Sequence, residues 1–259
     1  MTTGGEPEPE PVEIVAADRA AAYVVRVGGR DQSHVDLSDP TLLAFDYVRR
    51  MGDVVDAAAP AGEPVAVLHV GGAGLTLPRY VAATRPGSPQ VVLEPDADLT
   101  ALVRERLPLP RRSGIKVRPV DGVTGVRAVR DGWAGLVLLD AYAGGEVPAG
   151  LLVRSQVAEV DRVLAPGGLY LLNLADRAPF AATRRAVATL RERFAHVMVS
   201  AEPATLRGRR PGNLLVVVGH HPVPVAALSR RAASSAAPYR VLDAAAVSDG
   251  LGGGLPLDG

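Results

Sequence analysis

From Val65 onward, short apolar runs alternate with longer amphipathic stretches. The apolar runs predict five strands, at Val65 to Val70, Gln90 to Leu93, Ile115 to Pro119, Leu136 to Leu139 and Leu169 to Leu174. The stretches between them predict helices at roughly Leu75 to Thr84, Ala97 to Arg106, Gly122 to Val129 and Leu151 to Leu164, the last closed by Pro166-Gly167-Gly168. This order is typical of an α/β fold in which helices cover a parallel sheet.

The segment before this alternation predicts a smaller unit. Two short strands, Tyr23 to Val27 and Arg30 to Leu37, flank the turn Gly28-Gly29 and predict a β-hairpin. Ser38-Asp39-Pro40 is expected to start a helix whose apolar stripe continues to Val55.

The segment after the alternation predicts a closing pair of strands and a loosely organised tail. A helix near Phe180 to Phe194 is followed by His196 to Ser200 and Leu214 to Gly219, which are expected to pair antiparallel. Val225 to Ala233 predicts a helix, and Gly250 to Gly259 is expected to be flexible. The predicted organisation is a disordered tail (1–13), a hairpin and helix (14–60), a Rossmann-like domain (61–222) and a C-terminal helix with a flexible tail (223–259).

Composition narrows the classes of protein that fit this pattern. The 259 residues are 47% hydrophobic and 22% charged, which suits one α/β domain with appendages. Lys+Arg and Asp+Glu both number 28, so no overall charge attracts nucleic acid or an acidic membrane. The chain has no cysteine, which excludes disulfides, thiolate metal sites and a Cys nucleophile. An acidic, Pro-rich start and no apolar run of about 18 residues predict a cytoplasmic location.

A glycine-rich turn follows the first predicted strand of the main domain. It reads Gly71-Gly72-Ala73-Gly74, and Glu94 closes the next strand. Small residues let a ligand approach the backbone at a helix N-terminus, and an acidic side chain at that distance can accept both ribose hydroxyls. The spacing does not match G-x-G-x-x-G, and no Gly-Lys-Ser/Thr follows. The pattern therefore favours a nucleotide without a pyrophosphate, with a purely structural turn as the alternative.

Two further acidic residues follow the next two strands of this order. Asp121 comes after Ile115 to Pro119, and Asp140 after Leu136 to Leu139. In open α/β sheets ligands bind at the carboxyl ends of strands, so both are expected to share one crevice with Glu94 and the glycine turn. The alternative is that Asp121 caps a helix and Asp140 caps or turns a loop.

Taken together, these residues resemble the spermidine synthase (aminopropyltransferase) family, which has a class I methyltransferase fold. That fold implies a mostly parallel seven-stranded sheet with a late antiparallel strand, here preceded by a β-hairpin that ordinary methyltransferases lack. The resemblance runs from about Arg26 to Gly219 and rests on Gln32, Phe45-Asp46-Tyr47, Val70 to Gly74, Leu93 to Asp96, Val120-Asp121-Gly122, Leu139 to Ala143 and Leu164 to Gly168.

The resemblance implies a role for each matching residue. Asp140 would be the base that takes a proton from the attacking amine. Glu94 would bind ribose and Asp121 the adenine amine. The remaining cofactor-binding positions would be Gln32, Gly71, Gly72, Ala73, Gly74 and Gly122, and the substrate-binding positions Tyr47 and Tyr142. The resemblance also implies decarboxylated S-adenosylmethionine as co-substrate, methylthioadenosine as product, a small amine such as putrescine as acceptor, no metal, and a homodimer or homotetramer.

Two carboxylates of the family are missing from this chain. Gly74 stands where the family carries an aspartate, and Ala143 replaces the second aspartate of an Asp-x-x-Asp turn. A hydrogen bond to a charged group contributes about 1.5–3 kcal/mol, so two losses predict roughly 10²–10⁴-fold weaker amine recognition. Glu146, Asp36 and Asp39 are candidates to replace them. An S-adenosylmethionine-dependent methyltransferase and a non-catalytic nucleoside-binding or interaction protein therefore stay open as alternatives.

Other polar and aromatic positions are assigned structural roles. His69 is expected in the core, His34 at the surface or an interface, and Trp133 against the sheet, with the border of the adenine pocket as its alternative. No acidic cluster adjoins His220-His221, so no metal site is expected there. The loop Arg207 to Arg210 is predicted to be a solvated hairpin tip rather than an anion-binding or nucleic-acid site, because no aromatic residues interleave with it.

Overall fold

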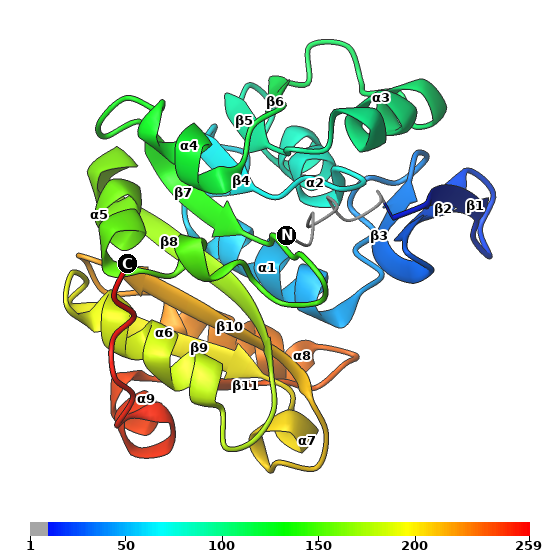
Figure 1. Ribbon diagram of the computed structural model, residues 1–259. Coiled ribbons are helices and arrows are strands. Elements are labelled where there is room, and N and C mark those ends of the chain that lie inside the picture. Colours follow the sequence, from blue (N-terminus) through cyan, green and yellow to red (C-terminus); the bar gives the residue numbers. More distant parts are fainter. Residues whose placement is uncertain (1–9) are drawn as a thin grey trace, which may run out of the picture.

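The computed structural model, which describes residues 10–259, is built around an eight-stranded sheet (Figure 1). The strand order is β11-β9-β10-β8-β7-β4-β5-β6, and β8, β7, β4, β5 and β6 run parallel. Its strands are β4 (Val67–Val70), β5 (Gln90–Leu93), β6 (Ile115–Arg118), β7 (Ala134–Leu139), β8 (Leu164–Asp176), β9 (His196–Ala201), β10 (Gly212–Gly219) and β11 (Arg240–Leu242). The α/β class and the late antiparallel strand, β10, are as predicted.

Helices cover both faces of this sheet because its central strands are apolar on both sides. One face packs against α4 (Gly122–Arg127), α5 (Arg154–Val163), α6 (Ala181–Arg191) and α9 (Ala244–Leu251). The other face carries α1 (Asp46–Ala57), α2 (Thr76–Thr84) and α8 (Val225–Ser234). Two short helices, η1 (Ala149–Leu151) and α7 (Pro203–Leu206), lie in connections, and α3 (Ala97–Arg106) packs against β5 and β6.

The C-terminal part is more ordered than the sequence predicts. Strand β11 pairs antiparallel with β9, which makes the sheet eight-stranded rather than seven-stranded. The segment Gly250 to Gly259, which was predicted to be flexible, makes specific contacts with the domain. The Leu257 carbonyl accepts from the Arg154 amide at 3.0 Å, and the Leu257 amide donates to Thr189 Oγ1 at 2.8 Å. Leu257 packs on the core between α5 and α6, so the tail is docked.

The connection into β8 also differs from the prediction. Helix α5 ends at Val163, and β8 begins at Leu164, so Pro166-Gly167-Gly168 lies inside the strand rather than closing the helix. The pairing of β8 with β7 shifts register between Ala134 and Leu136. The glycines therefore accommodate an irregular entry into the strand.

The N-terminal unit is a three-stranded antiparallel sheet of β1 (Val12–Ala16), β2 (Ala22–Val27) and β3 (Arg30–Asp36). The predicted hairpin is its β2–β3 pair, and β1 is an additional strand. Residues 1–9 of the predicted disordered tail lie outside the described residues, and Val12 already pairs with Val27. Val25 and Val35 are buried against Leu75, so the small sheet packs directly on the segment that leads into α2.

The turn after β3 is not the helix start that Ser38-Asp39-Pro40 predicts. The buried carboxylate of Asp36 accepts hydrogen bonds from the Ser38 amide at 2.9 Å, the Ser38 hydroxyl at 2.6 Å and the Asp39 amide at 2.9 Å. These bonds, the Ser38 hydroxyl foremost, lower the pKa of Asp36 to about 2. The chain therefore turns here, and α1 begins only at Asp46.

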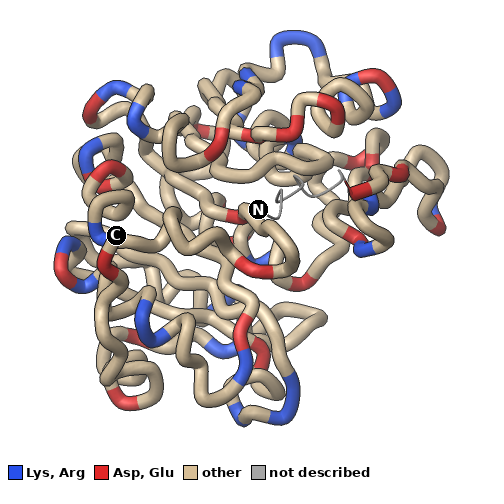
Figure 2. Tube along the Cα trace, viewed as in Figure 1, with Lys and Arg blue, Asp and Glu red and all other residues tan. Residues whose placement is uncertain are grey.

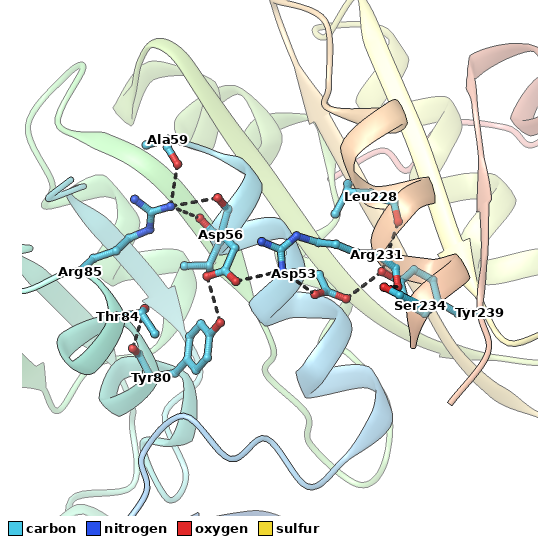
Figure 3. Close-up of polar contacts among 11 residues, drawn as sticks. Asp53, Asp56, Ala59, Tyr80, Thr84, Arg85, Leu228, Arg231, Ser234 and Tyr239 are labelled. Carbon is cyan, nitrogen blue, oxygen red and sulfur yellow. Dashed lines mark hydrogen bonds and ion pairs between the residues drawn. The ribbon is translucent and has the colours of Figure 1, made fainter. Parts of the chain in front are cut away.

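Polar contacts anchor α1 between α2 and α8 (Figure 3). Arg85, which is 1% exposed, donates to five carbonyl oxygens around the C-terminal end of α1. Asp56 accepts from the Tyr80 hydroxyl at 2.9 Å, and Asp53 accepts from the Tyr239 hydroxyl at 2.7 Å. Because the first turn of α1 carries Tyr47, these contacts fix one wall of the pocket described next.

Candidate nucleoside-binding and transfer site

A cavity of about 380 Å³ opens at the carboxyl ends of β4, β5 and β7, between the sheet and the N-terminal unit. Figure 2 shows acidic segments along this edge of the molecule. The cavity brings together Glu94, Asp121 and Asp140 with the glycine turn, as expected for an open α/β sheet. The other predicted site residues that line it are Gln32, Tyr47, Gly71, Gly72, Ala73, Gly122 and Tyr142.

Gly71 is required where the glycine turn leaves β4. Its φ is +96°, and a Cβ there would lie 2.3 Å from the Asp140 carbonyl oxygen. The turn thus passes directly under the loop that carries Asp140, and only glycine permits both the backbone conformation and the close approach. Backbone contact thus fixes the position of the glycine turn relative to the loop that carries Asp140.

The backbone amides of the glycine turn all donate within the protein. Gly71 N donates to the Leu93 carbonyl at 2.9 Å, and Gly72 N and Ala73 N donate to Glu94 Oε2 at 2.9 and 3.1 Å. Gly74 N donates to Ser33 Oγ at 3.0 Å. A phosphate-binding turn keeps such amides free for the anion, whereas this turn has none to offer.

Glu94 organises the turn from the end of β5. It is 9% exposed, and its second oxygen, Oε1, accepts from the Asp96 amide at 3.1 Å. Three amide bonds hold the carboxylate in one orientation with its edge at the pocket wall. The sequence predicts Glu94 as a ribose ligand, and the structure adds that it ties β5 to the glycine turn.

Gly74 is the one predicted cofactor residue that does not line the pocket. It faces the N-terminal sheet, where a Cβ would lie 2.7 Å from Ser33 Cβ and 3.1 Å from Val35 Cγ2. The prediction of Gly74 as a nucleoside contact is therefore corrected. An aspartate cannot replace Gly74 while β3 packs in this position.

Asp121 both caps a helix and borders the pocket. Its Oδ1 accepts from the Thr124 amide at 2.9 Å at the N-terminus of α4, and this bond leads the causes that lower its pKa. The side chain is exposed. At the adjoining Gly122 a Cβ would lie 2.4 Å from Val70 Cγ1, so glycine is needed for close packing on β4.

Asp140 follows β7 at the base of the pocket and is paired with an asparagine rather than with a cation. Asn173 Nδ2 on β8 donates to Asp140 Oδ1 at 2.8 Å, and Asn213 Nδ2 on β10 donates to Asn173 Oδ1 at 3.0 Å. Burial raises the pKa of Asp140 to about 6, although the Asn173 bond opposes the rise. A carboxylate with this pKa is ionised at neutral pH and can still accept a proton.

Two tyrosines flank Asp140. Tyr142 donates its hydroxyl to the Asn173 carbonyl at 3.0 Å and accepts from the Ala175 amide at 3.0 Å. Tyr47 reaches the pocket from the first turn of α1. Burial, and then the charge of Asp140, raise the pKa of both hydroxyls, so both remain neutral.

Asn173 and Ser33 are site residues that the sequence did not predict, and Asn213 was predicted only as part of the loop near Arg207 to Arg210. Asn173 had a signal, since it is the single polar residue within an apolar strand run, Leu169 to Leu174. Nothing in the sequence indicates that it lies beside Asp140, because that contact depends on the pairing of β7 with β8. Ser33 had no local signal at all.

The proposed replacements for the missing carboxylates do not enter the pocket. Asp36 accepts hydrogen bonds from the turn that follows it, and Asp39 accepts from the Thr41 amide and hydroxyl. Glu146 is exposed and does not line the cavity. Within residues 10–259, the site therefore gains no carboxylate in place of the two absent ones.

The other singled-out residues are mostly structural. His69 is buried, contacts Gln90 Oε1 at 2.9 Å and has its pKa lowered to about 4 by burial, but it also forms part of the pocket wall. Trp133 lines a different cavity, and His220 contacts Asp161 at 2.6 Å. Arg210 pairs with Glu202.

The described residues contain no group of three His, Asp or Glu side chains placed to hold a metal ion, and none of their helices meets the length and hydropathy of a membrane span.

Comparison with solved structures gives a close match in shape. The crystal structure of a probable spermidine synthase from Corynebacterium glutamicum ATCC 13032 matches with a TM-score of 0.90 and 26% identity, over 100% of this chain and 96% of that one. Spermidine synthase from Thermotoga maritima matches with a TM-score of 0.62 and 15% identity, over 89% and 76% of the two chains. Human methyltransferase-like protein 13 in complex with SAH matches with a TM-score of 0.53 and 19% identity, over 67% and 80%. No family model and no curated protein sequence matches the chain.

The fold and the pocket define a Rossmann-like protein of the class I methyltransferase type, with a small antiparallel sheet ahead of the main domain. Within that class the chain resembles the spermidine synthases, and it does so over its whole length.

Proposed function

We propose that this protein is an aminopropyltransferase that uses decarboxylated S-adenosylmethionine and an amine acceptor. The observation that carries this proposal is the charge of the pocket. It offers Asp140 at the reacting end, and the described residues that line it include no free cation or turn amide for an anion. Such a site suits a donor that has lost its carboxylate.

A cationic Arg side chain of the pocket bears on this preference for a donor without a carboxylate. Arg30 is the one Lys or Arg among the described lining residues, and it donates to both oxygens of Glu10 at 2.8 and 3.0 Å. S-adenosylmethionine carries a carboxylate that needs a donor, whereas the decarboxylated form carries only cations. An unpaired buried carboxylate is costly, so the pocket favours the decarboxylated ligand.

The reaction that fits is a single displacement. The amine nitrogen attacks the carbon next to the sulfonium, the carbon–sulfur bond breaks, and its electron pair leaves with sulfur as neutral methylthioadenosine. The proton lost by the amine passes to Asp140, directly or through one water molecule. Holding both reactants beside one another in the pocket contributes further acceleration.

The other lining residues divide between the two ligands. Gln32, Glu94, Asp121 and Gly122 lie on the side of β5, β6 and the N-terminal sheet, and we assign them to the nucleoside. Tyr47 and Tyr142 lie beside Asp140 and are assigned to the acceptor. A role in polyamine biosynthesis, a cytoplasmic location and a homodimeric or homotetrameric assembly form part of the same proposal.

Ligand preference tests the proposal. Methylthioadenosine and decarboxylated S-adenosylmethionine are expected to raise the melting temperature, and S-adenosylmethionine is not. Formation of methylthioadenosine in the presence of amines then shows transfer. A larger melting shift with S-adenosylmethionine would favour the methyltransferase alternative, which the fold also permits. Nucleoside binding without turnover on any amine would favour a non-catalytic binding protein.

A further inference from the structure

The carboxylates around the pocket restrict which amine can be the acceptor, an inference that rests on the proposed function. The described lining residues include five of them: Glu10, Glu94, Asp96, Asp121 and Asp140. Glu10 is paired with the Arg30 guanidinium, and Glu94 accepts from three backbone amides on the nucleoside side of the pocket. Glu94 follows β5, which lies two strands across the sheet from the β7 end that carries Asp140.

Asp96 and Asp121 are exposed helix caps on the nucleoside side. Each accepts a backbone amide through Oδ1, from Leu99 at 2.8 Å and from Thr124 at 2.9 Å. They follow β5 and β6, whereas Asp140 follows β7, with β4 between. Neighbouring strands are about 4.8 Å apart, which places these caps roughly 10 and 14 Å across the sheet from Asp140.

Around Asp140 itself the pocket wall is neutral. It consists of the two protonated tyrosines, Tyr47 and Tyr142, and of small or apolar residues: Val48, Ala141, Ala143, Gly144 and Gly145. Asp140 already faces the positively charged donor and must receive the proton of the attacking amine. Among the lining residues within 10–259, no further carboxylate in this half of the pocket is left for a second ammonium group.

We infer that the acceptor is an amine with one cationic group, whose far end is apolar or a neutral hydroxyl, rather than a diamine. A second ammonium placed against this wall would lose hydration without gaining a counter-ion. A methyl or hydroxyl end at the same distance meets no such penalty. The tyrosine rings and small side chains can pack against an alkyl chain.

Three amines with the same four-carbon chain test this inference: putrescine, 4-aminobutan-1-ol and n-butylamine. Each is supplied to the full-length protein with decarboxylated S-adenosylmethionine, and methylthioadenosine release gives kcat/KM. We expect 4-aminobutan-1-ol and n-butylamine to exceed putrescine by tenfold or more. A putrescine value equal to or above both monoamines overturns the inference while leaving the proposed transfer intact. No methylthioadenosine with any amine overturns the proposed function, and the inference with it.

A pair of variants at Ala143 provides an independent test of the inference. Ala143 faces the pocket, and its backbone is fixed by reciprocal bonds with Glu146 at 2.9 and 3.2 Å, so its side chain can be changed with little effect on the loop. Ala143→Asp is expected to raise the ratio of putrescine to n-butylamine kcat/KM by about 10–100-fold, the value of one charged hydrogen bond. Ala143→Asn, of the same size but neutral, should leave the ratio near that of the wild type. Equal ratios in both folded variants would contradict the inference.

Discussion

Asn173 lies on the strand next to Asp140 and donates its side-chain amide to Oδ1 of that carboxylate at 2.8 Å. The bond stabilises the ionised form and thereby opposes the rise in pKa that burial causes. Asn173 is itself oriented by Asn213, so the pKa of the proposed base depends on three neighbouring positions of β7, β8 and β10.

Asn173→Ala should shift the pH dependence of transfer. Without the amide donor the pKa of Asp140 rises further, so the acid limb of the kcat/KM profile moves to higher pH by about one unit. Asn213→Ala serves as the control, because it removes only the bond that orients Asn173 and should move the limb less. An unmoved acid limb in Asn173→Ala would exclude Asp140 as the titrating base.

Asp140→Asn should abolish turnover and yet stabilise the protein above pH 6. The folded pKa of Asp140, about 6, lies above the value of about 3.9 expected for an unfolded chain, so its ionisation favours unfolding. Stability therefore falls as the pH rises from about 4 to 6. The asparagine of the variant does not ionise, so its free energy of unfolding should exceed that of the wild type by about 1–2 kcal/mol at pH 8, but not at pH 4. Urea unfolding at the two pH values measures the difference, and nucleoside affinity should stay within a few-fold.

Glu94→Gln should weaken both nucleoside binding and the glycine turn. The amide group lacks one of the two acceptor oxygens that now hold Gly72, Ala73 and Asp96. Calorimetry should show methylthioadenosine binding weaker by about 1.5–3 kcal/mol, together with a lower melting temperature. Glu105→Gln, an exposed position on α3, is the matched control. Wild-type affinity in Glu94→Gln would contradict the role of Glu94.

Gly74→Ala should destabilise the protein through contact with β3. The new Cβ would lie 2.7 Å from Ser33 Cβ, and overpacking of this kind costs about 1–3 kcal/mol. The double variant with Ser33→Gly should recover part of the loss. Gly250→Ala on α9, where no atom lies within 4 Å, should instead be neutral or slightly stabilising. A neutral Gly74→Ala would show that β3 does not pack where the structure places it.

Arg85→Met should be the most destabilising of these changes. The variant removes the guanidinium donor from five carbonyl oxygens, several of them at the end of α1, and should lose about 3 kcal/mol or more. Arg231→Met, which removes exposed ion pairs to Asp53 and Asp56, should lose less than about 1 kcal/mol. The two unfolding free energies in urea distinguish a buried anchor from a surface pair.

Much of the fold could be predicted because its signals are local. The five central strands and the helices between them follow from hydrophobic periodicity, and Gly28-Gly29 marks the hairpin. The elements that were missed have weak local signals. Strand β11 has only three residues, and β1 follows a Pro-rich stretch. The turn at Ser38 resembles a helix start until Asp36 is seen to capture its amides.

The candidate site shows the same division. The amino-acid pattern was enough to place Glu94, Asp121 and Asp140 at strand ends beside a turn of small residues, because strand length and order put them there. That Gly74 faces Ser33, that Asn173 supports Asp140 and that Arg30 is neutralised by Glu10 follows from the packed fold alone. These contacts join segments that are distant in sequence. Their geometry depends on how the sheets and helices pack, which no local pattern encodes.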